Sequence, residues 1–169
     1  MAEHDQRQRG RRRHRGGIER RQPQQRIDGA DLRIVAPDAR MSVMEIKWGL
    51  IPDMSAIQSL RRLLPLDVAL ELTLTGRVVS GTEAKEIGLA TRVSATPRED
   101  ALALATEIAG KSPDAIRAAK RLFQEAWHAP AADGFLLEET LQRSLMGRPN
   151  QIESVKANFE KRAPRFQNP

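Results

Sequence analysis

Residues 41–53 read MSVMEIKWGLIPD, and Glu45 is a carboxylate set among mainly apolar neighbours in this stretch. Ionising a carboxylate beside apolar side chains costs hydration, so such a group protonates more easily and can both accept and give a proton. Glu45 is therefore the candidate general acid/base. The alternative interpretation is a glutamate on the solvent face of a half-buried strand, which is the commoner arrangement for such a pattern.

A second carboxylate, Asp53, follows eight residues after Glu45. It lies in a turn that Gly49 and Pro52 indicate. Two carboxyl groups in unlike surroundings can divide into an acid and a base. Asp53 is therefore the candidate partner of Glu45, although sequence spacing alone does not bring the two together.

Three ordered stretches resemble the enoyl-CoA hydratase/isomerase (crotonase) family: GADLRIVAPDARMSVMEIKWGLIPDM at 29–54, LTGRVVSGTEAKEIGLATRV at 74–93 and ANFEKRAPRF at 157–166. The resemblance covers residues 29–169 and corresponds to roughly the second half of a full-length member. It implies an α/β fold of the truncated crotonase-like (ββα spiral) kind, mostly helical in the part present. The helical region in the second half of the family builds a trimer or a dimer of trimers, so a homo-oligomer is also expected.

The resemblance also implies roles for individual residues. Glu45 matches the family's catalytic glutamate, which moves a proton on the acyl chain of a CoA thioester, and Asp53 matches the second carboxylate of the dienoyl-CoA isomerase branch. Lys161 and Arg162 match basic positions near bound CoA, where cations can pair with its phosphates. A solvated helix end that complements the helix dipole is an equally good interpretation of these two residues. The thioester itself makes the α-proton acidic, so no metal or redox cofactor is expected.

A non-catalytic remnant that acts only through oligomerisation is the competing hypothesis. In the hydratase branch a second glutamate precedes the first by about twenty residues, and that count reaches Gln25 here. The backbone N–H donors that stabilise the family's enolate, and the CoA-binding loops of its first half, are not recognisable in this sequence.

The first 28 residues form a basic arm of different composition. Nine arginines and three acidic residues precede Ile27, so the whole formal charge of +6 arises there. Such a segment cannot bury a core, and disorder is expected. A shifted reading frame of a GC-rich gene is the favoured interpretation of this composition. Nucleic-acid binding and a transit peptide are weaker alternatives, because the arm has no aromatic residues and little Ser.

The remaining residues predict a chain of short helices within one domain at 29–169. A strand is expected at 32–36 and an extended segment at 41–50. Helices are expected over 55–64, 66–74 and 80–88, from Thr96 to Gly110, from Ser112 through Ala126, and over 133–146 and 150–161. The expected helix caps include Ser55, Ser80, Asp133 and Asn150. The apolar stripe of the fifth helix predicts core or a subunit interface.

Composition excludes several other classes of protein. The 169 residues contain no cysteine, which rules out disulfides and thiolate metal sites and fits a cytoplasmic location. No apolar run reaches membrane-spanning length. The three histidines have no metal-ligand spacing, and no phosphate-binding or dinucleotide-binding motif occurs with supporting context.

Overall fold

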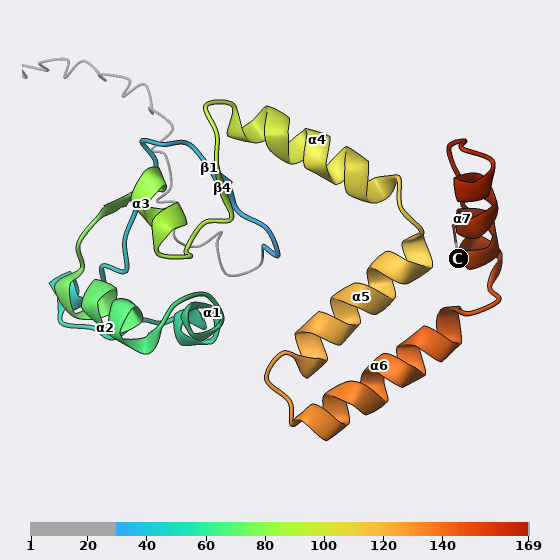
Figure 1. The fold of residues 1–169 in the computed structure, drawn as a ribbon. Helices are drawn as coiled ribbons and strands as arrows, with labels where there is room; N and C mark the ends of the chain where they lie inside the picture. The colour runs from blue at the N-terminus through green and yellow to red at the C-terminus, as the bar shows by residue number, and fades with distance from the viewer. Residues whose placement is uncertain (1–29, 169) are drawn as a thin grey trace, which may run out of the picture. The chain divides into compact units, whose positions relative to one another are not determined.

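The computed structural model describes residues 30–168, so the basic arm and the interpretations attached to it lie outside the described residues. Of the described residues, 58% are helical and 6% are strand, which confirms the expected mostly helical make-up. The described residues form two compact units. Unit 1 holds residues 30–33 and 37–91, and unit 2 holds residues 34–36 and 92–168. Figure 1 labels the helices and strands of both units.

Unit 1 is built on a short antiparallel pair of strands, β2 (Arg40–Met41) and β3 (Val79–Ser80), in which Met41 lies opposite Val79. Both of these side chains are buried. A 3-10 helix and three α-helices complete the unit: η2 (Glu45–Trp48), α1 (Ala56–Leu63), α2 (Leu66–Thr75) and α3 (Gly81–Glu86). α2 packs against η2 and contributes the fully buried Leu72, so this helix supports the segment that carries Glu45.

Local sequence signals explain where these helices begin and end. Pro65 directly precedes α2, and Gly76 ends it in the left-handed conformation with φ of 59°. Ser80 caps α3, because its Oγ accepts a hydrogen bond of 3.1 Å from the Glu83 backbone N–H. The predicted bounds of these helices are confirmed to within a few residues.

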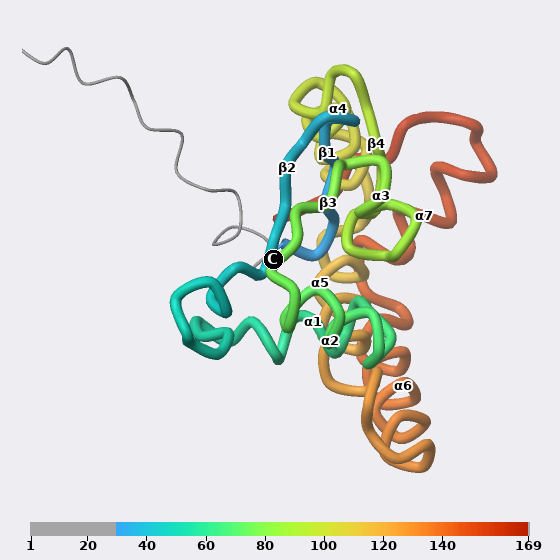
Figure 2. The backbone as a smooth tube through the Cα atoms, turned by 90° about the vertical axis from the view of Figure 1, so that its left-hand side faces the viewer, coloured from blue at the N-terminus to red at the C-terminus, as the bar shows by residue number. Residues whose placement is uncertain are grey.

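Unit 2 combines a short parallel pair of strands with four longer helices. β1 (Ile34–Val35) pairs with β4 (Arg92–Val93). The helices are α4 (Pro97–Ala109), α5 (Pro113–Ala126), α6 (Ala131–Leu145) and α7 (Pro149–Phe159). α4 packs on β1, α5 and α6 lie side by side, and α5 also contacts α7 (Figures 1 and 2).

Three local predictions were wrong. The extended segment at 41–50 becomes a two-residue strand followed by the 3-10 helix η2, so Glu45 lies on a helical turn rather than on a strand. Ser55 makes no side-chain cap, because its backbone is left-handed with φ of 64°. Asp133 and Asn150 lie inside the first turns of α6 and α7, whose capping positions are Pro130 and Arg148.

Candidate functional site

The segment that carries Glu45 is held at both of its ends. On the side of β2, the buried Ser42 hydroxyl donates a hydrogen bond of 3.0 Å to the Gly76 carbonyl oxygen at the end of α2. On the other side, η2 ends at Gly49, which is left-handed with φ of 69°, and the Leu50 N–H donates to the Glu45 carbonyl oxygen at 3.1 Å. These contacts fix the backbone of Glu45.

Gly76 provides a second constraint on the same segment. A Cβ atom added at this position would lie 2.9 Å from Cγ2 of Ile46, closer than real Cβ contacts allow. The backbone at Gly76 therefore touches the residue that follows Glu45. This approach needs a residue without a Cβ, as does the left-handed φ of 59°.

The Glu45 side chain is half-buried, and its Oε2 atom is buried with no hydrogen-bond partner among residues 30–168. Buried polar atoms in folded proteins almost always have a partner, so an exception of this kind calls for an explanation. A carboxylate oxygen free of protein partners can take a proton from, or give one to, a bound molecule. The assignment of Glu45 as the acid/base residue stays a prediction, and this unpartnered oxygen is the feature that such a role would use.

Asp53 lies in the turn between η2 and α1, and its surroundings differ from those of Glu45. Its side chain is exposed, and its backbone carbonyl accepts a hydrogen bond of 2.9 Å from the Ala56 N–H. The next two residues, Met54 and Ser55, both have positive φ (49° and 64°). Left-handed backbone costs free energy in residues other than glycine, so the turn beside Asp53 stores strain. Glu45 and Asp53 therefore belong to the same unit but differ in burial.

Lys161 and Arg162, the predicted phosphate-binding residues, lie in unit 2 just after α7. Arg162 donates from Nη1 and Nη2 to the two carboxylate oxygens of Glu153, at 2.6 and 3.0 Å, and from Nε to Glu160 at 2.6 Å. These bonds raise the pKa of Arg162 above its ordinary value and lower the pKa of Glu153 to about 2. Lys161 is exposed, and its side chain has no ion-pair partner in the described part of the chain.

Sequence analysis missed Asn150, a buried polar residue in the first turn of α7. Its amide nitrogen donates to Asp114 at 2.8 Å and to the Gln167 carbonyl oxygen at 2.9 Å, and its oxygen accepts from the Gln167 N–H at 2.8 Å. Asn150 thereby ties α7 to the start of α5 and to the end of the chain. The sequence pattern predicts only that Asn150 caps the last helix, and a capping pattern carries no information about contacts with residues as distant as Asp114.

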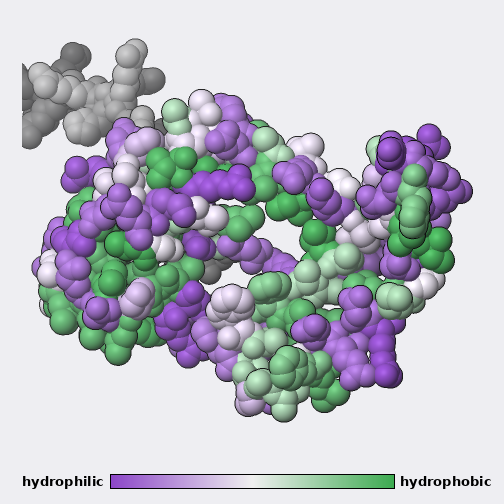
Figure 3. Space-filling view, in the orientation of Figure 1, coloured by the Kyte–Doolittle hydropathy of each residue, from purple (hydrophilic) through white to green (hydrophobic). Residues whose placement is uncertain are grey.

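A groove of about 290 Å³ lies in unit 2 at the junction of α5 and α6. Phe123 and Trp127, stacked with ring centroids 5.6 Å apart, line it together with Phe135. All three rings are largely exposed. In unit 1, apolar side chains gather over α1 and α2, shown in green in Figure 3, and Leu66 and Leu74 are among the exposed ones.

No group of three or more His, Asp or Glu side chains within residues 30–168 is arranged to hold a metal ion. None of the helices in that range has the length and apolar character needed to cross a membrane.

Comparison with known proteins gives the class of this chain. The sequence pattern of the enoyl-CoA hydratase/isomerase family matches residues 29–169, and the chain belongs to this family. The crystal structure of an enoyl-CoA hydratase from Bacillus anthracis is similar, with a TM-score of 0.78 and 32% identity over 81% of this chain and 54% of that one. The crotonase-like fold expected from the sequence motifs is thereby confirmed.

Two curated relatives are also similar to this chain. A "Probable enoyl-CoA hydratase" of Mycobacterium bovis is 37% identical over 140 residues, which are 80% of this chain and 54% of the relative. The mitochondrial enoyl-CoA hydratase domain-containing protein 2 of Mus musculus is 35% identical over 142 residues, 80% of this chain and 48% of the relative. The chain thus spans about half the length of the curated relatives that it matches.

Proposed function

We propose that the chain carries the acid/base half of an acyl-CoA enzyme of the enoyl-CoA hydratase/isomerase type, with Glu45 as the group that moves the proton. The observation that carries this proposal is the buried Oε2 atom of Glu45, which has no hydrogen-bond partner among the described residues. Family membership supports a CoA thioester as the substrate.

The proposed chemistry is proton transfer at an acyl chain activated by its thioester. In hydration of a 2-enoyl-CoA, the hydroxyl of water adds to C3 and a proton is delivered to C2. The thioester carbonyl holds the developing negative charge as an enolate-like intermediate. A carboxylate acts as base toward the water and, once protonated, as acid toward C2. This route needs no metal or redox cofactor, because the thioester itself stabilises the carbanion.

Hydration and isomerisation differ in whether Asp53 takes part in the proton transfer. Isomerisation along the chain takes a proton from one carbon and returns it to another, and a second carboxylate suits that task. The names of the two curated relatives above both contain the words enoyl-CoA hydratase, which supports hydration. The exposure of Asp53 supports the same choice, because its carboxylate is solvated whereas that of Glu45 is half-buried. We therefore propose hydration, with isomerisation through Glu45 and Asp53 as the alternative.

A chain that only associates with other subunits is the second candidate function. The exposed aromatic groove of α5 and α6 supports association, since contiguous apolar surface of this kind marks interaction sites. We propose a homo-oligomer, a trimer or a dimer of trimers, whose mass in solution is the test. A cytoplasmic location is proposed from the lack of cysteine and is tested by cell fractionation. Nucleic-acid binding through the basic arm is the weakest of the candidates.

The experiment is turnover of a 2-enoyl-CoA and of a 3,5-dienoyl-CoA by the purified chain, compared with the Glu45→Gln and Asp53→Asn variants. Glu45→Gln is expected to abolish turnover, whereas Asp53→Asn leaves hydration intact. Glu86→Gln is the matched control, because it removes an exposed carboxylate of α3 in the same unit. A dienoyl-CoA reaction that requires Asp53 would establish isomerisation. A folded wild-type chain without turnover of either substrate would leave association as the function.

A further inference from the structure

Arg77 lies between α2 and β3, and its guanidinium group joins two helices of unit 1. Nε donates a hydrogen bond of 2.7 Å to Oε1 of Glu71 in α2, and Nη1 donates one of 2.5 Å to Oε1 of Glu83 in the first turn of α3. We name these three residues the bridge. Hydrogen bonds between ionised partners are short and strong, and the planar guanidinium fixes the directions of both bonds. The bridge therefore ties α2 to the start of α3.

The α3 side of the bridge is anchored in the core of unit 1. The Glu83 N–H donates to Oγ of Ser80 at 3.1 Å, which joins the first turn of α3 to the end of β3. α3 packs on β2 and β3, and its Ala84 is fully buried. Buried, close-packed side chains leave little room for displacement. Glu83 therefore gives Arg77 an anchor whose position is set by this core.

The α2 side of the bridge reaches the segment that carries Glu45. Gly76 directly precedes Arg77, and its carbonyl oxygen accepts the 3.0 Å hydrogen bond from the buried Ser42 hydroxyl. A Cβ added at Gly76 would lie 2.9 Å from Cγ2 of Ile46, so the Gly76 backbone is in contact with that side chain. Ser42 and Ile46 lie on either side of Glu45 in the sequence. A shift of the Gly76 backbone therefore acts on this segment from both sides.

We propose that Arg77 is a positioning residue, which holds Gly76 against Ile46 and so places the Glu45 carboxylate for proton transfer. The inference rests on the proposed function, in which Glu45 moves the proton. Arg77 takes no part in the transfer itself, because a guanidinium is not deprotonated in proteins. Its ion pairs are partly exposed, and pairs of this kind add little to stability. Loss of the bridge is therefore expected to displace Glu45 without unfolding the chain.

The test compares hydration of a 2-enoyl-CoA by the full chain with hydration by Arg77→Gln and by Glu83→Gln. Each variant is expected to lower kcat by about tenfold, because catalytic groups tolerate little displacement. KM is expected to change by less than about twofold and Tm by less than about 3 °C. The double variant is expected to be no slower than either single variant, since both break the same bridge. Loss of kcat with KM and Tm kept is a result that a merely structural role would not produce.

A second measurement does not depend on turnover. NMR spectra of protein with selectively labelled isoleucine methyl groups report the surroundings of Ile46 directly, and an Ile46→Val variant identifies its resonance. The Ile46 resonance is expected to shift in Arg77→Gln and in Glu83→Gln, because both variants free the Gly76 backbone that contacts this side chain.

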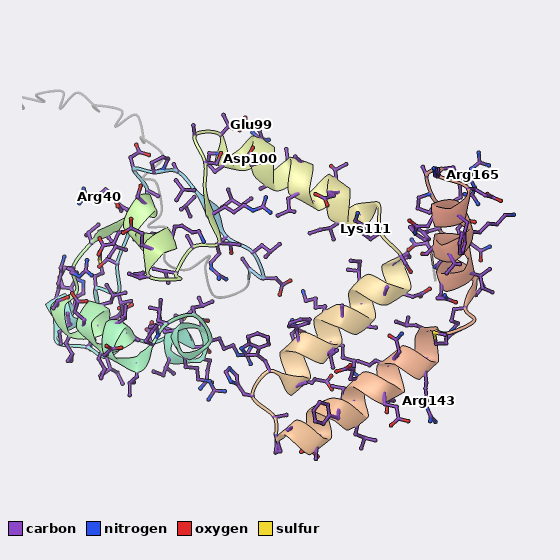
Figure 4. All side chains as sticks on the ribbon, viewed as in Figure 1. Arg40, Glu99, Asp100, Lys111, Arg143 and Arg165 are labelled. Carbon is purple, nitrogen blue, oxygen red and sulfur yellow. The ribbon has the colours of Figure 1, made fainter. Side chains whose placement is uncertain are left out.

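Arg40→Gln is the matched control for the loss of an arginine. Arg40 is exposed in β2 of the same unit, and its side chain has no ion-pair partner among residues 30–168 (Figure 4). This variant is expected to leave both kcat and the Ile46 resonance unchanged. An unshifted Ile46 resonance in Arg77→Gln would overturn the inference. A fall in Tm of more than about 5 °C alongside the loss of kcat would overturn it as well, since Arg77 would then support the fold in general.

The outcomes separate this inference from the proposed function. A folded wild-type chain without turnover, in which the bridge variants still shift the Ile46 resonance, refutes the proposed function and supports the link from Arg77 to the Glu45 segment. A chain that hydrates enoyl-CoA, with the bridge variants as fast as wild type, does the reverse. A folded chain with neither turnover nor a shifted resonance overturns both.

Discussion

Replacing Gly76 with alanine tests the close contact that supports the Glu45 segment. The new Cβ would lie 2.9 Å from Cγ2 of Ile46, and forcing extra atoms into a packed site typically costs about 1–3 kcal/mol. The left-handed φ of 59° adds about 1–2 kcal/mol for an L-residue. Together these terms predict that Gly76→Ala lowers the free energy of unfolding by about 2–5 kcal/mol.

Gly49→Ala is the matched control for this variant. Gly49 is also left-handed, with φ of 69°, but a Cβ there would meet nothing within 4 Å. Gly49→Ala should therefore lower the free energy of unfolding only by the cost of a left-handed backbone in an L-residue, about 1–2 kcal/mol. Urea unfolding followed by the fluorescence of Trp48, which lies in η2, measures both variants, and their difference isolates the contact with Ile46. Equal losses of stability in the two variants would refute the close-contact argument.

The same substitution has a consequence for activity. Relief of the clash moves Ile46, and hence η2, so Gly76→Ala is expected to reduce kcat in the hydratase assay by at least tenfold, since catalytic groups tolerate little displacement. Gly147→Ala is the control in unit 2, because Gly147 is left-handed with φ of 75° and open space around its Cβ position. If both variants kept the wild-type kcat, Gly76 would have no part in positioning Glu45.

Three further predictions concern stability. Ser80→Ala removes the cap of α3 and should lower the free energy of unfolding in urea by about 1 kcal/mol. Ser55→Ala, at a position without a side-chain cap, should leave it unchanged. Similar losses of stability in the two variants would contradict the cap assignment. Asn150→Ala breaks three part-buried hydrogen bonds and should cost at least about 2 kcal/mol. The exposed Asn158→Ala should cost less than about 0.5 kcal/mol. The pKa of Glu153 falls from 4.5 to about 2 on folding, so its contribution is fully present above pH 4.5 and is lost as the pH drops toward 2. The Tm advantage of wild type over Glu153→Gln should shrink across this window, and an advantage independent of pH would show that the ion pair adds nothing.

Helix positions and family membership could be predicted from the sequence because they depend on residues that are near one another in the chain. Pro65 and Gly76 bracket α2, and Ser80 caps α3, by contacts that span a few residues. Local prediction failed where the backbone conformation, or the residue at which a helix begins, differed from what the residue type favours. Ser55, for example, has the composition of a helix cap but a left-handed backbone that prevents it from acting as one.

The sequence by itself determined the family, the approximate bounds of the helices and the choice of Glu45 as a candidate acid/base. Only the tertiary structure decided that Oε2 of Glu45 is buried without a partner among the described residues, because η2 packs against α2, a helix well separated from Glu45 in sequence. Likewise, only the structure separated Lys161 from Arg162, which are adjacent and both basic. Arg162 is neutralised by Glu153, nine residues earlier, and this pairing arises because the chain turns sharply at the end of α7.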